Sequence, residues 1–280
     1  MKTIRTVTEL RAWPRSGSVG LVPTMGAFHA GHLSLIRAAR ASCDHVVVWL
    51  FVNPTQFTET ADLDAYPRDE ARDAALAAAN GADVLFAPAA AEVYPAGFAT
   101  TVTVAGLGDT LEGVHRPGHF AGVATVVAKM LNIVRPDRAF FGSKDAQQVA
   151  LVRRLAADLD LPVRIEALPI VREPDGLALS SRNVRLDPAD RARAAALHRA
   201  LRSAEAAVAA GERDGARLRA AAAGELADVD PEYVAVVHPD TFEPVATVNG
   251  RVLIAVAARV GATRLIDNVL IETRQERFLP

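Results

Sequence analysis

The 280-residue chain has a single cysteine, Cys43, and only three lysines among its 31 basic residues. One cysteine excludes an intrachain disulfide framework and a zinc site built from several thiolates. The formal net charge is −2, so the protein has no global field that would attract nucleic acid or an anionic membrane. Small anionic ligands would therefore be held by local charges, and no nucleic-acid partner is expected.

Long hydrophobic runs are also missing. The N-terminus, residues 1–5, lacks the apolar run of a signal peptide, and no segment approaches the ~20 uncharged apolar residues that span a bilayer. We therefore expect a cytoplasmic protein with no membrane contact. Half of the residues are hydrophobic and 23% are charged, which is ample apolar material for a core.

The three lysines are Lys2, Lys129 and Lys144. Arginine is a poor substitute for a compact point charge, so a lysine kept in an arginine-rich chain can be chemically required. Lys2 lies outside any motif, so scarcity alone assigns no function. It directs attention to Lys144, which lies in a polar segment described below.

Short apolar runs alternate with helical patterns through the first half of the chain. The patterns predict strands at 18–23, 45–52, 83–88, 138–142 and 163–168, and helices at 32–42, 68–80, 120–134 and 146–158. The run 45–52 is almost continuously hydrophobic, which is typical of a parallel strand covered on both faces. The alternation predicts a Rossmann-like, doubly wound α/β sheet, whose ligands bind beyond the carboxyl ends of its strands.

The pattern changes near residue 175. Asp187-Pro188 is a good helix start, and Asn249-Gly250 between apolar runs is a hairpin signal. Helices are predicted at 188–210 and 213–227, and strands at 232–238 and 252–257. We therefore expect two domains, an α/β domain over residues 1–175 and a smaller α+β domain over residues 176–280.

The strongest local signal lies between a predicted strand and a predicted helix, in Pro23-Thr24-Met25-Gly26-Ala27-Phe28-His29-Ala30-Gly31-His32. The N–H groups and dipole of a helix start favour a phosphate, and Gly31 permits close approach of a nucleotide. His29 and His32 add donors that can follow charge onto the phosphates during in-line attack. The H-x-G-H tetrapeptide can also arise by chance. A zinc site is disfavoured because a helical histidine pair prefers i, i+4 spacing and no HEXXH glutamate is present.

A second strand-to-helix junction is polar and contains Gly142, Ser143, Lys144, Asp145, Gln147 and Gln148. Lys144 beside a glycine turn suits a phosphate contact, and a solvated surface lysine is the alternative. Asp145 can bind a ribose or simply cap the helix. The glutamines can donate to and accept from a polar substrate.

Three further segments carry side chains suited to anions or hydroxy acids. In Ser180-Ser181-Arg182, two hydroxyls precede a guanidinium that can engage two phosphate oxygens. Asn53 and Gln56 are neutral amides that can orient a hydroxy acid, although Asn-Pro is also a plain turn. Arg116 and His119 lie in a Gly/Pro loop where they can meet a carboxylate or phosphate, and a salt-bridged surface loop fits the spacing equally well.

Together the motifs resemble the pantothenate synthetase family, within the H-x-G-H nucleotidyltransferase superfamily. The resemblance rests on PTMGAFHAGH (23–32), FVNPTQF (51–57), HRPGHFAGV (115–123), FGSKDAQQ (141–148) and LALSSRN (177–183), in family order and at family spacing. The chain departs from the family pattern at Ser143, where Glu is usual, and at Leu179, where Met is usual. Leu for Met conserves volume, and position 143 is expected to contribute backbone.

The resemblance implies an activity. ATP and (R)-pantoate would give pantoyl-adenylate and pyrophosphate, and β-alanine would then give pantothenate and AMP, a reaction of pantothenate and coenzyme A biosynthesis. It also implies that the domain over residues 1–175 binds ATP and pantoate and that the domain over residues 176–280 is lid-like. Mg²⁺-ATP as cosubstrate, small-molecule partners only and a homodimer are implied as well, while the ligands of the metal stay unassigned.

The resemblance further implies the residues of the site. The ATP site would contain Pro23, Thr24, Met25, Gly26, Ala27, Phe28, His29, Ala30, Gly31, His32, Gly142, Ser143, Lys144, Asp145, Val171, Leu179, Ser180, Ser181 and Arg182. The substrate contacts would come from Asn53, Gln56, Phe57, Arg116, His119 and Gln148. His32 would act on the transferring phosphoryl group, and His29, Lys144 and Arg182 would complete the catalytic set.

Three other functions fit parts of the pattern. Another H-x-G-H nucleotidyltransferase would release pyrophosphate without an amine and would form no AMP. A non-catalytic nucleotide-binding protein would bind ATP without turnover. An aminoacyl-tRNA synthetase fragment is disfavoured because the sequence has no basic surface for tRNA.

Overall fold

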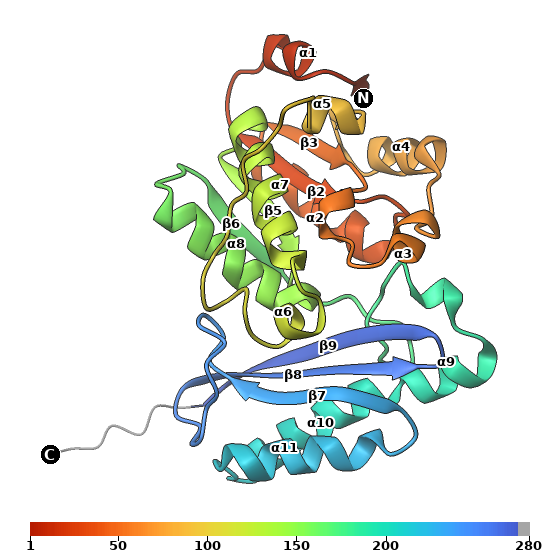
Figure 1. Ribbon diagram of the computed structural model, residues 1–280, viewed down its shortest axis with the longest axis vertical. Coiled ribbons are helices and arrows are strands. Elements are labelled where there is room, and N and C mark those ends of the chain that lie inside the picture. The colour runs from red at the N-terminus through yellow and green to blue at the C-terminus, as the bar shows by residue number, and fades with distance from the viewer. Residues whose placement is uncertain (274–280) are drawn as a thin grey trace, which may run out of the picture. The chain divides into compact units, whose positions relative to one another are not determined.

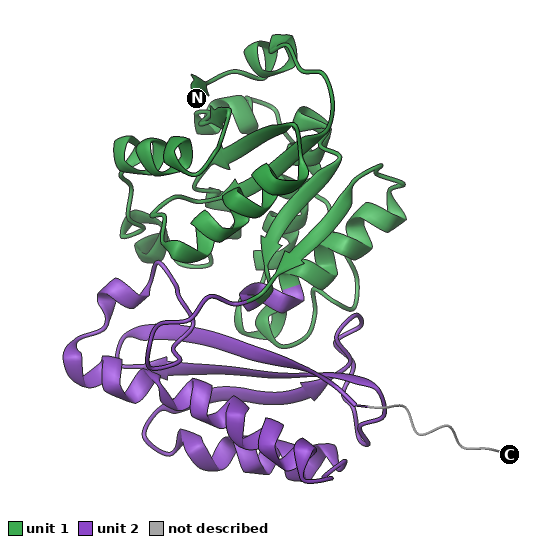
Figure 2. Cartoon of the chain, turned by 180° about the vertical axis from the view of Figure 1, so that it is seen from behind, with its two compact units in different colours: residues 1–143, 148–169 green, residues 144–147, 170–280 purple. Residues whose placement is uncertain are grey.

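A computed structural model describes residues 1–273 of the chain (Figure 1). The chain divides into two compact units (Figure 2). The first contains residues 1–143 and 148–169, and the second contains residues 144–147 and the chain from Ile170 onward. The short segment 144–147 thus groups with the second unit although residues of the first flank it on both sides. The functional division at residues 175 and 176 stays a prediction.

The first unit is built on a six-stranded parallel sheet in the order β1-β4-β3-β2-β5-β6. Its strands are β1 (Lys2–Ile4), β2 (Val19–Thr24), β3 (His45–Leu50), β4 (Val84–Phe86), β5 (Arg138–Gly142) and β6 (Arg164–Leu168). From β2 the chain winds to β3 and β4 on one side, and it later returns through β5 and β6 on the other. The switch point therefore lies between β2 and β5, and the predicted Rossmann-like, doubly wound class is confirmed.

Helices connect these strands. They are α1 (Val7–Ala12), α2 (Ala30–Ser42), α3 (Thr60–Asp64), α4 (Glu70–Ala79), α5 (Ala90–Val93), α6 (Glu112–His115), α7 (His119–Val134) and α8 (Ala146–Asp158), with 3₁₀ turns η1 (Pro54–Gln56) and η2 (Ser143–Asp145). The helix predicted at 68–80 is α4, which ends at Ala79 with Asn80 as its C-cap, and Gly81 has a φ of +99°. β1 and α1 were not predicted. The signal for α1 was Thr6 three residues before Glu9, which form a capping box.

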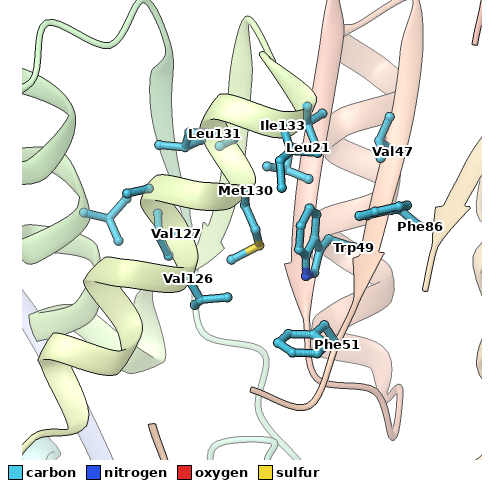
Figure 3. Close-up of a cluster of buried hydrophobic side chains, with 14 of the residues drawn as sticks. Leu21, Val47, Trp49, Phe51, Phe86, Val126, Val127, Met130, Leu131 and Ile133 are labelled. Carbon is cyan, nitrogen blue, oxygen red and sulfur yellow. The ribbon is translucent and has the colours of Figure 1, made fainter. Parts of the chain in front are cut away.

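Both faces of this sheet are covered, and the strands alternate between two cores. Leu21, Trp49 and Phe86 enter a core with α7 and α8, where Trp49 meets Phe86 edge-on at 4.7 Å between ring centroids (Figure 3). Val22 and Val48, the next positions along these strands, enter a second core with α2 and α4. Double coverage is the reason that the strands read as continuous apolar runs.

The second unit contains a three-stranded antiparallel sheet with helices on one face (Figure 1). The strands are β7 (Asp230–Val237), β8 (Arg251–Val260) and β9 (Thr263–Glu272), and the helical segments are η3 (Asn183–Arg185), α9 (Pro188–Ala194), α10 (Ala196–Ala209), α11 (Gly215–Ala223) and η4 (Gly224–Leu226). Ile254 and Val256 of β8 pack with Leu197 and Leu201 of α10. This α+β arrangement confirms the predicted class of the smaller part.

Details of the second unit differ from the prediction. The helix predicted at 188–210 starts at Pro188 with Asp187 as its N-cap, but Ala195, with a ψ of −15°, divides it into α9 and α10. The helix predicted at 213–227 also ends early, because its last residues form η4.

The hairpin signal at Asn249-Gly250 was misplaced. β7 and β8 do pair, but residues 238–250 connect them, so Asn249-Gly250 only ends a long connection. The tight hairpin joins β8 to β9, where Val260 pairs with Thr263 and Gly261 has a φ of +58°. No helix within residues 1–273 has the length and apolarity needed to cross a membrane.

Candidate nucleotide and substrate site

The loop from β2 to α2 carries the H-x-G-H motif and is fixed from α4. Gly26 and Ala27 have positive φ angles of +94° and +53°, a conformation that leaves backbone N–H groups without partners in the sheet. The carboxylate of Asp73 accepts from the N–H groups of Ala27 and Phe28, both at 2.8 Å, and the Asp73 side chain is 1% exposed. Asp73 lies outside the motif segments of the sequence, and only the fold brings α4 to this loop.

The two histidines of the motif form the start of α2. His29 is the N-cap, and its Nδ1 accepts from the N–H of Gly31 at 3.2 Å. His32 Nδ1 accepts from the N–H of His29 at 3.4 Å, so the pair forms a reciprocal capping box. The two rings lie 4.2 Å apart between centroids. With Nδ1 as the acceptor, each neutral ring carries its proton on Nε2, which makes Nε2 the donor at the helix N-terminus.

The capping arrangement itself requires glycine at position 31, whether or not a ligand is bound. A Cβ at Gly31 would lie 2.9 Å from Cε1 and 3.0 Å from Nδ1 of His29, closer than real Cβ contacts. The expected close approach of a nucleotide at Gly31 stays a prediction. The observed neighbour of Gly31 is the imidazole of His29.

Gln56 lies in η1, after β3, and its amide is oriented by Asn53. Asn53 is 1% exposed and donates from Nδ2 to Gln56 Oε1 at 3.0 Å and to the carbonyl of Gly122 at 3.2 Å. Its Oδ1 accepts from Thr55 and Tyr94. The Asn53 amide is therefore fully engaged by protein groups, and the geometry supports an indirect role, in which Asn53 sets the orientation of Gln56.

The other side of the Gln56 amide faces a weak acceptor. Gln56 Nε2 donates to the sulfur of Met25 at 3.2 Å, and a thioether is a poor hydrogen-bond acceptor. A carboxylate or hydroxyl oxygen would be a better partner for the same N–H group. Burial raises the pKa of the Tyr94 phenol, which stays a neutral donor to Asn53.

Arg116 and His119 also converge on η1. His119 is buried and donates from Nδ1 to the carbonyl of Gln56 at 2.8 Å, so its Nε2 accepts from Arg116 Nη1 at 3.0 Å. Arg116 Nη2 also donates to the carbonyl of Gln56 at 3.4 Å. The structure thus brings together Met25, Gln56, Asn53, His119 and Arg116, which the sequence places in three separate segments.

A cavity of about 680 Å³ lies at the same edge of the sheet. Met25 and Gly26 line it together with residues that follow β1, β3 and β4. Its wall also contains Arg5 and Glu70, which lie outside the motif segments of the sequence. Their side chains form an ion pair, with Arg5 Nη1 at 2.8 Å from Glu70 Oε2, and this pair lowers the pKa of the Glu70 carboxyl.

Lys144 and the Ser-Ser-Arg segment belong to the second unit. The Lys144 side chain is 19% exposed, and its Nζ lies 3.8 Å from Asp145 Oδ1. The backbone N–H of Leu179 donates to the carbonyl of Val171 at 2.9 Å, and Arg182 N–H donates to Ser180 Oγ at 3.2 Å. Asn183 ties this segment to Glu173 through a 2.9 Å hydrogen bond. Val171 and residues 179–182 are therefore neighbours, as their assignment to one site requires.

Three further predicted site residues are Gly142, Phe57 and Gln148. Gly142 ends β5, and a Cβ there would meet no protein atom within 4 Å. Phe57 lies edge-on to Tyr66 at 5.7 Å, and Gln148 is half-buried in the first turn of α8. Within residues 1–273, no group of three or more His, Cys, Asp and Glu side chains is arranged to hold a metal ion.

The fold and the strand-to-helix loop together define the class of the protein. It has a doubly wound parallel α/β sheet with an H-x-G-H segment at the helix start that follows the first strand of the switch point. A family model described as pantoate-beta-alanine ligase matches residues 2–270. The chain belongs to the pantoate–β-alanine ligase family.

Individual relatives cover nearly the whole chain. A pantothenate synthetase of Roseiflexus castenholzii is 52% identical over 278 residues, which is 97% of this chain and 100% of that protein. One from Cereibacter sphaeroides is 54% identical over 273 residues, 95% of this chain and 98% of that protein.

Solved structures agree with these relatives. The crystal structure of pantothenate synthetase from Thermus thermophilus is 48% identical, has a TM-score of 0.93 and covers 96% of this chain and 99% of its own. Pantoate–β-alanine ligase from Francisella tularensis, complexed with β-γ ATP and β-alanine, is 32% identical with a TM-score of 0.78, and covers 96% and 97% of the two chains.

Proposed function

We propose that the chain catalyses the ATP-dependent condensation of (R)-pantoate with β-alanine to give pantothenate, AMP and pyrophosphate. The observation that carries the proposal is the match to the pantoate–β-alanine ligase family over residues 2–270. Relatives above 50% identity over nearly their full length support it, as does the ligase that was crystallised with an ATP ligand and β-alanine. The reaction is a step of pantothenate, and hence coenzyme A, biosynthesis.

In the first step, a carboxylate oxygen of pantoate attacks the α-phosphorus of ATP. A new P–O bond forms, the bond from the α-phosphorus to the bridging oxygen breaks, and pyrophosphate leaves with the electron pair. No covalent enzyme intermediate is needed, so the residues act by positioning and by neutralising charge. The outcome of this step is a mixed anhydride, pantoyl-adenylate.

The start of α2 is suited to the phosphates in this step. Nε2 of His29 and His32 can donate to phosphate oxygens because both Nδ1 atoms accept backbone N–H groups. His32 acts on the transferring phosphoryl group and His29 stabilises its charge. Lys144 and Arg182 supply further positive charge, and residues 23–32, 142–145, 171 and 179–182 bind ATP.

Pantoate is held by the cluster around η1. Gln56 Nε2 exchanges its weak contact with the Met25 sulfur for a pantoate oxygen, while Asn53 keeps the amide in orientation. Arg116 lies beside His119 and places a guanidinium near this amide. Phe57 and Gln148 complete the substrate contacts.

In the second step, the free amine of β-alanine attacks the acyl carbon of pantoyl-adenylate. A C–N bond forms, the bond from the acyl carbon to the AMP oxygen breaks, and AMP leaves. The nitrogen loses its proton to solvent or to a neighbouring base. The Gln56 amide serves this step as well, as a contact for β-alanine.

Mg²⁺ accompanies ATP in this proposal. Mg²⁺ is usually held by substrate phosphates, waters and one or two carboxylates, so a site built from three protein side chains is not needed. When bound, it neutralises phosphate charge. We further propose that the enzyme is a homodimer in the cytoplasm.

Omission of each substrate in turn tests the proposed function. ATP with pantoate is expected to give pyrophosphate and one equivalent of bound pantoyl-adenylate. AMP and the amide are expected only after β-alanine is added. Pyrophosphate without any dependence on pantoate, or turnover that ends at a nucleotidylated product, would point to another H-x-G-H nucleotidyltransferase, and ATP binding without turnover would point to a non-catalytic protein.

A further inference from the structure

Asn268 of β9 makes a direct contact with the candidate catalytic lysine. Its Nδ2 donates to the backbone carbonyl of Lys144 at 2.9 Å, across 124 positions of sequence. Asn268 is 6% exposed, so the donor side of this hydrogen bond is buried. Lys144 and Asn268 lie in the same compact unit, which contains segment 144–147 together with the chain from Ile170 onward (Figure 2).

Asn268 is itself held in place by Asp267 and Arg172. Asp267 Oδ1 accepts from the N–H of Asn268 at 2.8 Å, and Arg172 Nη2 approaches the carbonyl of Asn268 at 3.4 Å. Arg172 also binds Asp267 with both nitrogens, at 2.6 and 3.0 Å. The backbone of Asn268 is therefore fixed on its N–H side and its carbonyl side by one bidentate ion pair.

The same guanidinium reaches the other candidate ATP segment of this unit. Arg172 Nη1 donates to the carbonyl of Gly176 at 2.9 Å, and Arg172 forms a β-bridge with Ala178. Its neighbour Val171 accepts from the N–H of Leu179, the first residue of the Leu-Ser-Ser-Arg segment. One hydrogen-bonded network thus connects the backbone of Lys144 with the backbone that precedes Ser180.

The burial of the Asp267 carboxylate favours a functional role for this network in addition to packing. Its carboxylate is 2% exposed at a position of β9 whose register partner is Val256, a core residue. A buried ion pair of this kind is weak support for stability, since a well-packed apolar pair of similar volume is often as good. The charged pair of Arg172 and Asp267 thus occupies positions where two apolar residues would pack equally well.

We propose that Arg172, Asp267 and Asn268 are positioning residues that hold Lys144 in register with the Ser180-Ser181-Arg182 segment. This inference rests on the proposed function, in which Lys144 and Arg182 contact ATP phosphates. Lys144 has a long, flexible side chain, so the position of its ammonium depends on how firmly its backbone is held. Asn268 supplies that restraint from a strand with no substrate contact assigned to it.

The kinetic test compares three substitutions in the full-length enzyme. Asn268→Ala removes the donor to Lys144, and Asn268→Asp also places a second carboxylate beside Asp267. Thr273→Val is the matched control, because Thr273 near the end of β9 donates from Oγ1 to the carbonyl of Gly250 at 3.0 Å, away from Lys144. Pyrophosphate release is measured with ATP and pantoate.

The expected result is a loss of catalytic efficiency that is specific to ATP and leaves pantoate binding nearly unchanged. Asn268→Ala is expected to lower kcat/KM for ATP about tenfold, the effect of one misplaced buried donor, with KM for pantoate within about twofold of wild type. Asn268→Asp is expected to lose more, and Thr273→Val is expected to match the wild-type enzyme. Wild-type kcat/KM for ATP in a folded Asn268→Ala enzyme would overturn the inference.

The scarcity of lysine allows a second measurement. Its result would not change if Asn268 had a merely structural role. Protein labelled with ¹³C-lysine has only three labelled residues, Lys2, Lys129 and Lys144. In wild type, ATP is expected to shift the Lys144 Cε–H signals and to leave those of Lys2 and Lys129 in place. In Asn268→Ala, the Lys144 shift is expected only at about tenfold higher ATP concentration.

The outcomes separate this inference from the proposed function. A wild-type protein with no pantoate-dependent pyrophosphate release would refute the function, whatever the variants do. An active wild type with an unchanged Lys144 response in Asn268→Ala would refute the positioning role alone. If both Asn268 variants lose the wild-type circular dichroism spectrum, Asn268 serves folding, and the positioning inference is overturned.

Discussion

The β2–α2 loop and the Lys144 region present phosphate-binding candidates in different ways. In the β2–α2 loop the contacts are local, because the N–H of His29 donates to His32 Nδ1 and the N–H of Gly31 donates to His29 Nδ1. In the Lys144 region, the contact with the Lys144 carbonyl comes from Asn268, 124 residues away, and Asn268 is held in turn by Arg172 and Asp267. The first arrangement depends on residues that are close together in the sequence, and the second exists only in the folded chain.

The difference explains why one region is easy to recognise and the other is not. A capping box constrains residue types at fixed spacing, so the H-x-G-H segment stands out in the sequence. Lys144 is held through its carbonyl, which every residue type possesses, and so its anchor leaves no pattern around position 144. The local loop is not self-sufficient, however, because Asp73 must supply both acceptors for Ala27 and Phe28.

The largest predicted effect tests whether both regions serve the same chemical step. His32→Ala and Lys144→Ala are each expected to reduce pyrophosphate release from ATP and pantoate by about 10²–10³-fold or more, since each removes a preorganised charge or donor. Circular dichroism and thermal unfolding are expected to match wild type. Near-wild-type release by either variant would remove that residue from the catalytic set and separate the two regions in function.

The next prediction tests how far the β2–α2 loop depends on a distant residue. Asp73→Ala leaves two backbone N–H groups without acceptors and is expected to lower the free energy of unfolding by about 1–3 kcal/mol. It is also expected to lower kcat/KM for ATP, because the loop that carries His29 moves. Urea titration and pyrophosphate release measure the two effects.

Asp73→Asn is the matched control for that change. The amide keeps one acceptor oxygen, so it is expected to lose less stability than Asp73→Ala. Equal stability of Asp73→Ala and wild type would show that the loop holds its shape without α4, and that the β2–α2 region is local throughout.

A smaller effect is expected from a pair of glycine substitutions. Gly31→Ala adds a Cβ against the His29 ring and is expected to lower the rate of pyrophosphate release about tenfold by moving a donor. The melting temperature is expected to change little, because the helix propensity of Ala offsets the weakened His29 cap. Gly142→Ala meets no protein atom, so any effect is expected in KM for ATP alone. A fall in Gly31→Ala melting temperature without loss of rate would contradict the assignment.

The smallest predicted effect concerns pH and the second unit. Burial, with a further contribution from the Arg172 charge, lowers the pKa of the His198 imidazole below its ordinary value of 6.5. As pH falls below that value the unfolded chain binds the proton first, so the free energy of unfolding decreases until the pH passes the folded pKa. His198→Gln is expected to flatten this decrease in urea titrations between about pH 7.5 and about pH 5. A slope equal to that of wild type would remove His198 from the pH response.

Much of the fold could be predicted because its cause is periodic. The strands of the parallel sheet alternate between two apolar cores, as Leu21 and Val22 do, and this produces runs that are easy to identify. β9 was missed for the opposite reason. Its inward position 267 is an aspartate, which breaks the apolar period, and the residue that makes its burial acceptable is Arg172, 95 positions away.

The site shows the same division. The motif segments located Met25, Gln56 and His119, but only the structure shows that His119 binds the carbonyl of Gln56 and that Gln56 binds Met25. Asn53 was predicted as a substrate contact, and its amide is in fact occupied by four protein groups. A sequence pattern identifies polar residues near a strand end without showing where their hydrogen bonds go.

The sequence by itself determined the class of the fold, the family and the start of α2 with its two histidines, because hydrophobic period, capping and motif order are properties of neighbouring residues. The tertiary structure decided which side chains orient the others. Asp73, Asn53 and Asn268 bind backbone groups far from them in the chain. A hydrogen bond to a backbone carbonyl or N–H places no demand on the residue type it reaches, so only the folded chain reveals it.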